Sequence, residues 1–260
     1  MDLESYRNSE REQERINNLL SLIPKAGKTI LEIGARDGYM SIKLSEHFQT
    51  VVALDLQKPN IDFPGVVPVH GDIISLEFSD NTFDCVLCSE VLEHISPDLL
   101  NRACDEITRV AIRYVIIGVP FEQENRIGRT TCANCGKGNP PYGHVNTFSI
   151  KRLRKLFKDV RIKEIAFVGQ EKNIKTNRLA IVFMDFAGNP FGTYDQEEKC
   201  LYCKQSIIAP AGKQPFFKKV SAKFAWGLIR VQNFHKKQLS KPIWVHVVLS
   251  KEEKYNHSNE

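Results

Sequence analysis

Long apolar runs, a secretory leader and two common nucleotide-binding motifs are all missing from this sequence. No stretch approaches the roughly 20 apolar residues that cross a bilayer, and the polar start Met-Asp-Leu-Glu-Ser-Tyr-Arg lacks the apolar segment of a signal peptide. We therefore expect a cytoplasmic protein without a transmembrane segment. The sequence contains no Gly-x-Gly-x-x-Gly fingerprint and no P-loop, which argues against the domains that those motifs mark.

The composition is that of an ordinary globular protein. The 260 residues are 42% hydrophobic and 26% charged, enough to bury a substantial core in one α/β domain with an embellishment. Seven cysteines without a leader favour reduced thiols or a metal site over a disulfide scaffold. The net charge of +5 is modest. However, residues 211–250 contain no acidic residue and eight basic ones: Lys213, Lys218, Lys219, Lys223, Arg230, Lys236, Lys237 and Lys241.

Apolar strand-like runs alternate with amphipathic helical segments along the first two thirds of the chain. Strands are predicted at residues 28–33, 50–55, 66–70, 83–88, 114–120 and 160–168, and helices at 9–23, after Gly38, from Ser96–Pro97 onward and at 149–158. This alternation predicts a Rossmann-like, seven-stranded, mostly parallel sheet with helices on both faces. Two later segments, 179–186 and 242–250, each read as the last, antiparallel strand, and we favour 242–250.

The junction after the first strand is the most informative stretch. Glu32, Gly34 and Gly38 form the pattern acidic-x-Gly-x-x-x-Gly between a strand and a helix, where bare backbone N–H groups can meet an anionic or zwitterionic cofactor. The pattern resembles motif I of the class I S-adenosylmethionine-dependent methyltransferases of the type 11 or type 23 kind. The family usually carries a further glycine where this chain has Arg36.

The resemblance assigns roles to residues at the ends of successive strands. It implies that Glu32, Gly34, Ala35 and Gly38 border the methionine portion of S-adenosylmethionine. It also implies that Asp55, next to Leu56, accepts the ribose hydroxyls and that Asp72, next to Ile73, binds the adenine amino group. Ser89 and Glu90, after the fourth strand, would line the methionine side of the site. The plainer interpretations are that Asp72 forms a turn and that His94 is a packed histidine.

Two Cys-x-x-Cys pairs lie beyond the fifth strand. Cys132 and Cys135 form one pair, and Cys200 and Cys203 form the other. Each resembles half of a zinc knuckle, so we predict a structural four-cysteine zinc site, with His144 as an alternative ligand. The pairs would belong to a Cys-rich insertion, residues 121–148 and 187–212, that forms a lid on a single methyltransferase domain spanning 1–260. Cys85, Cys88 and Cys104 are interpreted as buried apolar residues.

The predicted reaction is methyl transfer to a small-molecule or glycan or lipid-linked acceptor, at oxygen. Transfer to a hydroxyl needs a base, and the candidates are His144, in the segment that resembles the family's acceptor-side loop, and Glu90. No Asn-Pro-Pro-Tyr signature follows the fourth strand, which disfavours methylation of adenine N6. The alternatives are an RNA-directed methyltransferase and a non-catalytic adaptor that binds cofactor or nucleic acid around a structural zinc site.

Residues 213–241 predict a basic amphipathic helix. Phe217, Val220, Phe224, Leu228 and Val231 share one face of it. We expect this face to pack across the domain and leave a solvated basic face. An anionic membrane surface and RNA are the other partners that such a helix would suit.

Overall fold

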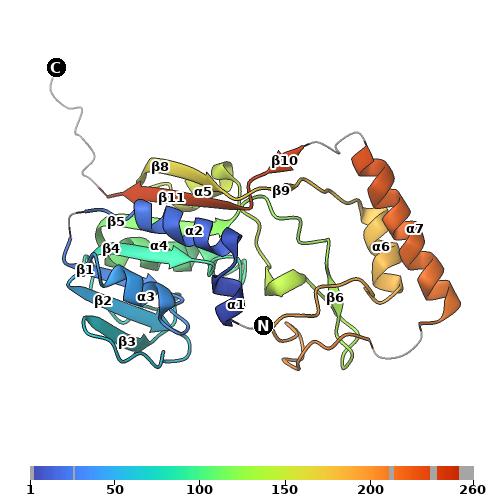
Figure 1. Ribbon diagram of the computed structural model, residues 1–260, viewed down its shortest axis with the longest axis horizontal. Helices are drawn as coiled ribbons and strands as arrows, with labels where there is room; N and C mark the ends of the chain where they lie inside the picture. The colour runs from blue at the N-terminus through green and yellow to red at the C-terminus, as the bar shows by residue number, and fades with distance from the viewer. Residues whose placement is uncertain (1–2, 26, 211–213, 235–238, 252–260) are drawn as a thin grey trace, which may run out of the picture. The chain divides into compact units, whose positions relative to one another are not determined.

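The computed structural model describes residues 3–25, 27–210, 214–234 and 239–251 (Figure 1). These residues divide into two compact units. The sheet unit comprises Glu10–Phe121, Phe148–Gly169 and Trp244–Glu260, and the cysteine unit comprises Met1–Ser9, Glu122–Thr147 and Gln170–Ile243. Apart from their end residues 121 and 148, the segments predicted as a Cys-rich insertion fall in the cysteine unit. Lys213, Lys236 and Lys237 lie outside the described residues.

A seven-stranded sheet forms the sheet unit, as predicted. Its order is β3-β2-β1-β4-β5-β11-β8, in which β11 runs antiparallel between β5 and β8 and the other four neighbouring pairs are parallel (Figure 1). The strands are β1 Thr29–Ile33, β2 Thr50–Asp55, β3 Val66–His70, β4 Phe83–Ser89, β5 Ala111–Pro120, β8 Arg161–Val168 and β11 Trp244–Ser250. The predicted choice of 242–250 as the antiparallel strand is confirmed.

Alternating side chains of the central strands build two hydrophobic cores. Ile30 of β1 packs on one face with Leu19 and Leu44, whereas the next residue, Leu31, packs on the other face with Ile107. Helices therefore cover both faces of the sheet. They are α2 Glu10–Ser21 and α3 Tyr39–Leu44 on one face, and α4 Leu100–Val110 and α5 Ile150–Leu156 on the other.

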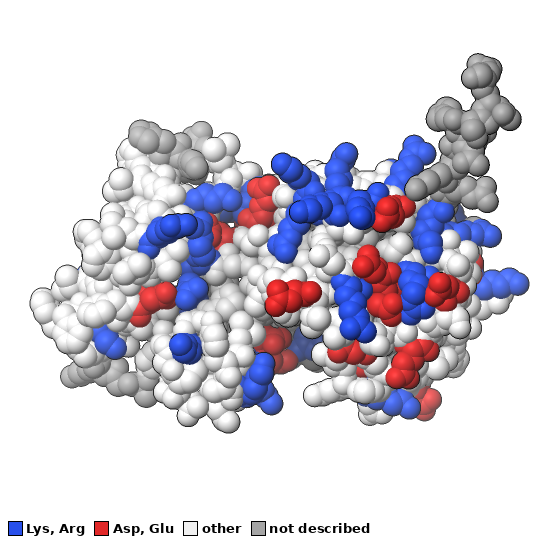
Figure 2. Space-filling model, turned by 180° about the vertical axis from the view of Figure 1, so that it is seen from behind, with Lys and Arg blue, Asp and Glu red and all other residues white. Residues whose placement is uncertain are grey.

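The cysteine unit contains short strands and two packed helices. Its elements are α1 Leu3–Arg7, β6 Thr130–Thr131 paired with β7 Gly138–Asn139, a 3₁₀ turn η1 Pro141–Gly143, β9 Glu171–Lys172 paired with β10 Ser240–Lys241, α6 Arg178–Phe186 and α7 Phe216–Asn233. Among the described residues, no helix is long and apolar enough to cross a membrane. Acidic and basic side chains are interspersed over the surface drawn in Figure 2.

Two predicted elements differ from the structure. Residues 179–186, read as a strand, belong to helix α6, because the Asn177 side chain caps its start by accepting a hydrogen bond from the Ala180 N–H at 2.9 Å. An uninterrupted apolar run fits a buried strand and a packed helix equally well. The helix predicted from Ser96–Pro97 begins instead at Leu100, after a turn closed by the Leu99 N–H on the Ser96 carbonyl.

The packing face of α7 is also not the predicted one. The buried residues of α7 are three small ones, Ser221, Ala222 and Ala225, and one larger one, Ile229. Phe217, Val220, Phe224 and Val231, expected to pack inward, are exposed, and Leu228 is only half-buried. The Ser221 hydroxyl donates a hydrogen bond to the Phe183 carbonyl of α6 at 2.7 Å. Small side chains allow this close approach of the two helices, which leaves the large ones outside.

Candidate functional site

The loop between β1 and α3 rests on the carboxyl end of β2. The N–H groups of Gly34 and Ala35 both donate to the Leu54 carbonyl, at 2.8 and 3.1 Å. The next N–H, of Arg36, donates to the Asp55 carboxylate at 2.8 Å. Two neighbouring parallel strands and their loops are thus joined at one edge of the sheet, the place where doubly wound folds bind ligands.

Left-handed backbone shapes this loop. Gly34, Arg36 and Gly38 have φ values of 86°, 50° and 81°. A Cβ on Gly34 would lie 2.4 Å from Val91, and one on Gly38 would lie 2.3 Å from Ile61, so both positions require glycine. Arg36 adopts the conformation that the family's glycine would favour, at a cost of about 1 kcal/mol for a residue with a side chain. The departure from the family pattern therefore does not change the loop.

The two acidic residues at the ends of β1 and β2 differ in environment. Glu32 is 5% exposed, beneath the loop, and accepts a hydrogen bond from the Ser41 hydroxyl. Burial raises the pKa of Glu32 to about 7, although the Ser41 hydrogen bond opposes the shift. Asp55 is half-buried, and besides Arg36 it accepts from the Gln57 N–H at 3.3 Å. Asp55 therefore presents its carboxylate at the surface, whereas Glu32 supports the loop from below.

The residues around Asp55 provide one exposed apolar side chain, Leu56, and one exposed acidic side chain, Asp72. Leu56 is exposed, while Ala35 and Ile73 are buried, Ile73 within the hydrophobic core. Asp72 is exposed, and its carboxylate accepts the Ile74 N–H at 3.1 Å in a turn closed on Ser75. The turn-forming role of Asp72 is thus real, and it engages one carboxylate oxygen, Oδ1.

A buried polar network lies at the carboxyl end of β4. The Arg15 guanidinium donates to both oxygens of Glu12, at 2.8 and 2.5 Å, and to the Ser89 hydroxyl at 2.8 Å. It also lies 6.0 Å from the centroid of the Trp244 ring. The Trp244 indole N–H in turn donates to Glu90 at 3.2 Å. Helix α2, strand β4 and strand β11 are joined here by polar side chains.

Glu90 and Glu93 are carboxyl groups with unused hydrogen-bonding capacity. Among the described residues, Oε1 of Glu90 and both oxygens of Glu93 have no hydrogen-bond partner. Burial raises the pKa of Glu90, against the opposing effects of Arg15 and the Trp244 N–H, and burial together with Glu90 raises the pKa of Glu93 well above its usual range. Glu90 also has φ of 57°, a strained value for a residue with a side chain.

Sequence reasoning found Ser89 and Glu90 but missed Glu12, Arg15, Glu93 and Trp244. One signal was available for the first two. Glu12 and Arg15 fall on the same side of the predicted helix as Ile16 and Leu19, and charged residues on an apolar face must be paired. Nothing comparable distinguishes Glu93 in the sequence, since its burial depends on the turn that follows β4.

His144 belongs to the cysteine unit. It follows the 3₁₀ turn η1, is 8% exposed and has Nδ1 2.6 Å from the Gln123 side-chain oxygen. The Asn125 side chain donates to its backbone carbonyl at 2.7 Å. These contacts fix the His144 ring within its own unit. Its role as a base stays a prediction.

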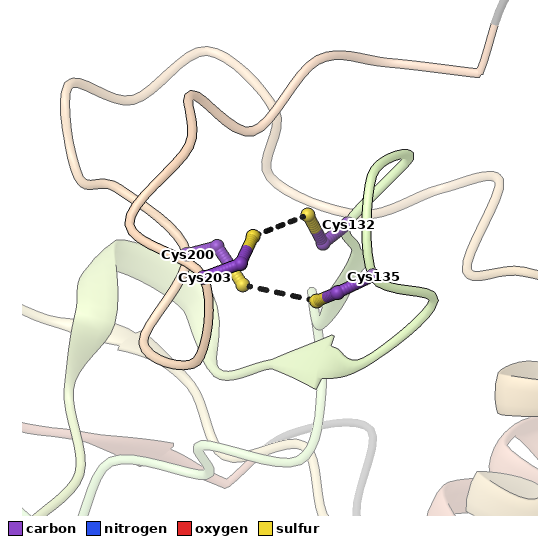
Figure 3. Close-up of side chains that lie close together, drawn as sticks. All are labelled: Cys132, Cys135, Cys200 and Cys203. Carbon is purple, nitrogen blue, oxygen red and sulfur yellow. Dashed lines mark hydrogen bonds between the residues drawn. The ribbon is translucent and has the colours of Figure 1, made fainter.

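The four predicted cysteine ligands do come together (Figure 3). Their sulfur atoms all lie within 4.8 Å of one another, with Cys132 and Cys203 3.6 Å apart and Cys135 and Cys200 3.6 Å apart. A tetrahedral ion with zinc–sulfur bonds of about 2.3 Å separates its sulfurs by about 3.8 Å. A disulfide would require about 2.05 Å. The cluster therefore has the dimensions of a metal site built from reduced thiols.

Both Cys-x-x-Cys pairs have the same backbone hydrogen bonds. The Cys132 N–H donates to the Lys137 carbonyl and the Gly136 N–H to the Cys132 carbonyl; Cys200, Gln205 and Lys204 repeat this pattern at 2.9 Å each. Gly136 and Lys204 have φ of 69° and 60°. Burial would raise the pKa of the Cys200 thiol, but the N–H groups of Cys203 and Tyr202 and the Asn139 amide lower it to about 6. The second turn thus favours the thiolate that a metal requires.

Part of the sheet unit matches a known family model. Residues 31–115, from within β1 into β5, match the family model described as a methyltransferase domain. No curated protein matches the chain.

Solved structures resemble the chain over nearly its whole length. A putative methyltransferase from Bacillus halodurans is 14% identical, with 90% of this chain and 97% of that chain covered and a TM-score of 0.56. A SAM-dependent methyltransferase from Archaeoglobus fulgidus is 16% identical, with coverage of 96% and 98% and a TM-score of 0.54. A Haloferax volcanii structure, a complex of the Trm112 methyltransferase activator and a putative methyltransferase, is 14% identical, with 96% of this chain and 94% of that chain covered and a TM-score of 0.53. At these identities the likeness shows the class I methyltransferase fold alone.

The buried Glu32 carboxyl predicts a pH-dependent stability. Its folded pKa of about 7 exceeds the ordinary value of 4.5, so its contribution to stability is present below pH 4.5 and is lost as the pH rises through 7. Replacing it with the uncharged isostere, Glu32→Gln, should stabilise the cofactor-free protein by about 3 kcal/mol at pH 8 and change little at acidic pH. Urea unfolding at both pH values, followed by Trp244 fluorescence in a Trp226→Phe background, measures this.

Glu46→Gln, at an exposed position in the same region, is the control and should leave the free energy of unfolding unchanged at both pH values. Equal pH dependence of the Glu32→Gln variant and the parent protein would show that Glu32 titrates normally.

Proposed function

We propose that this chain, a class I S-adenosylmethionine-dependent methyltransferase by its fold and by its match over residues 31–115, binds the cofactor at the loop of residues 34–38. The observation that carries the proposal is the position of Asp55. Its carboxylate lies at the end of β2, hydrogen-bonded to the N–H of Arg36 in the glycine-bounded loop. Side chains are excluded at Gly34 and Gly38, so the backbone there is bare and fits a cofactor that approaches it closely.

The neighbouring residues complete the proposed cofactor site. Asp55 would accept the two ribose hydroxyls in charge-assisted hydrogen bonds. Exposed Leu56 would cover one face of the adenine, and the free oxygen of Asp72 would accept from the adenine amino group, with the backbone of Ile73 beside it. Glu32 would act from beneath the loop by holding Ser41 and the start of α3. Gly34, Ala35, Gly38 and Ser89 would border the methionine portion.

Glu90 is the proposed base. Bound S-adenosylmethionine would supply an electrophilic methyl group on a sulfonium. An acceptor hydroxyl loses its proton during such a transfer, and the Glu90 carboxylate, with one oxygen unused and a raised pKa, is suited to take it. The Trp244 N–H and Arg15 hold Glu90 and Ser89 in place. His144 remains the second candidate.

The acceptor we propose is a small-molecule or lipid-linked glycan hydroxyl. Three carboxyl groups, those of buried Glu12 and Glu93 and of half-buried Glu90, lie near a single guanidinium, Arg15, at the end of β4. Glu12 already occupies the Arg15 guanidinium, so this group of residues offers no further cation to the phosphates of RNA, which proteins normally neutralise with Lys and Arg. A neutral acceptor needs no such cation.

The four-cysteine cluster is proposed to hold one structural zinc ion. Cys132, Cys135, Cys200 and Cys203 would fill all four positions, which leaves none for a catalytic water. The Asn139 amide, 3.5 Å from the Cys200 sulfur, would support the site from outside, while its side-chain oxygen accepts the Leu201 N–H. The ion would tie two loops that are otherwise joined by few regular elements.

Cofactor binding should depend on the Asp55 carboxylate. Asp55→Ala should weaken S-adenosylhomocysteine binding about 10- to 100-fold, the value of charged hydrogen bonds, as measured by isothermal titration. Asp159→Ala, an exposed aspartate of the same unit, is the matched control and should bind normally. Equal affinity of Asp55→Ala and the parent would contradict the site.

The class of acceptor can be tested with methyl-tritiated S-adenosylmethionine and a cell extract separated into small-molecule, lipid and RNA fractions. Label should appear in the small-molecule or lipid fraction, and Glu90→Gln should lower its rate of appearance about 10²- to 10⁴-fold while still binding S-adenosylhomocysteine. Glu164→Gln, on the exposed surface of β8, is the control. Label in RNA would contradict the acceptor proposal, and label in no fraction would favour the alternative of a non-catalytic adaptor.

Metal analysis tests the cysteine cluster. The purified protein should contain one zinc ion per chain, and the double variant Cys200→Ser, Cys203→Ser should contain almost none. Cys104→Ala, a buried cysteine outside the cluster, should retain the ion. A parent protein that neither contains zinc nor takes it up when zinc is added under reducing conditions would refute the site.

A further inference from the structure

Helices α6 and α7 pack together through a narrow face. Besides the Ser221 hydrogen bond to α6, contact comes from Ala180 of α6 and from Ala222 and Ala225 of α7, all at most 2% exposed. Ile229 is the one larger residue on the buried face of α7. The residues fully buried between the helices are thus mostly small, and many of the large apolar side chains of both helices are exposed.

Those outer side chains form a stripe on each helix. Leu179, Val182 and Phe186 of α6 and Phe217, Val220 and Phe224 of α7 follow the same spacing, i, i+3 and i+7, which places each set along one helix face. All six are between 48% and 62% exposed. On α7 the stripe continues to Val231, which is 77% exposed. A helix usually packs such a stripe against the protein core, whereas α6 and α7 expose theirs to solvent.

The two stripes meet to form one surface. The rings of Phe186 and Phe217 have centroids 6.0 Å apart, and those of Phe183 and Phe224 are 4.8 Å apart. We call the six stripe residues together with Val231 the apolar face. An apolar surface shared by two elements is larger than the isolated exposed residues that are normal on a protein.

Basic residues border the apolar face. Lys219, Lys223 and Arg230 are exposed and recur at i, i+4 and i+11 on α7, which puts them on a line about 110° around the helix from Phe217, Val220 and Phe224. Helix α7 has no acidic residue. The one acidic residue of α6, Asp185, accepts hydrogen bonds from Arg129 and Asn189. Positive charge therefore stands beside the apolar face without a balancing carboxylate on α7.

We propose that the apolar face of α6 and α7 binds an anionic lipid surface. The stripes would enter the boundary between headgroups and acyl chains, and Lys219, Lys223 and Arg230 would contact the lipid phosphates. This is the arrangement of interfacial helices, with aromatic and aliphatic residues on one side and Lys or Arg beside them.

The chemistry of the face distinguishes a lipid from two other occupants. RNA would find phosphate contacts and three phenylalanine rings, but the other four residues of the apolar face, Leu179, Val182, Val220 and Val231, are aliphatic and offer no ring on which a base can stack. A second copy of the chain would bring its own basic line against the first. Anionic lipid complements both features, the aliphatic stripe and the positive border. The inference does not depend on the proposed methyltransferase function.

The test is sedimentation of the full chain with sucrose-loaded vesicles. Binding should be strong with phosphatidylcholine that contains phosphatidylglycerol and weak with phosphatidylcholine alone. Phe217→Ser should lower the partition coefficient about tenfold, as expected for one aromatic side chain leaving an apolar phase. Lys219→Gln together with Lys223→Gln should lower it about 25-fold, about fivefold for each charge near an anionic surface.

Two control variants match these changes. Phe167→Ser removes a phenylalanine of the sheet unit that is 51% exposed, against 57% for Phe217. Phe167 also has one aromatic neighbour, Phe121. Arg154→Gln with Lys155→Gln removes two exposed charges from α5. Both should bind vesicles like the parent, and circular dichroism should show all variants folded.

Several outcomes would overturn the proposal. They are no binding to anionic vesicles, equal losses in the test and control variants, or a concentration-dependent dimer that Phe217→Ser abolishes in a protein that does not bind vesicles. A gel shift of single-stranded RNA that the lysine variant abolishes, again without vesicle binding, would assign the face to nucleic acid instead.

Discussion

One constraint organises the sheet unit: the loop of residues 34–38 must sit on the end of β2 with its backbone bare. The Leu54 carbonyl holds the N–H groups of Gly34 and Ala35, and Asp55 holds that of Arg36. The φ values of 86°, 50° and 81° at Gly34, Arg36 and Gly38 follow from this geometry. Buried Glu32 supports it from below through Ser41. A ligand at this edge would therefore meet backbone N–H groups and the Asp55 carboxylate.

The sheet was predictable because its central strands are largely buried on both faces. Such strands appear as continuous apolar runs, and the run at 50–55 became β2 with the same limits. The edge strand β3 also has the predicted limits, 66–70, although only Val66 in it is buried. The same property made 179–186 ambiguous, since an apolar run alone does not distinguish a buried strand from a helix. Asn177, which caps α6, was the local signal that decides it. The start of α4 depended on a turn that Ser96 and Leu99 close.

Long-range contacts were harder to predict. The resemblance put Asp55 at the end of the second strand, where it lies beside the glycine-bounded loop, and the two Cys-x-x-Cys pairs lie near one another, because each is a local pattern with a known structural context. Arg15 and Trp244, more than 200 residues apart in sequence, meet only once α2 and β11 have packed on the sheet. The face of α7 was misjudged for a related reason. Hydrophobic periodicity finds an apolar stripe but does not say whether protein covers it, and here Ala222 and Ala225 face α6 instead.

A crystal structure with S-adenosylhomocysteine tests the central claim most directly, because it locates the ligand independently of affinity or turnover. The account predicts the ribose hydroxyls on the Asp55 carboxylate, the adenine beside Leu56 and the homocysteine portion along the loop of residues 34–38. Ligand density elsewhere on the chain, or a loop that stays empty at saturating concentrations of a ligand shown to bind in solution, would contradict the account.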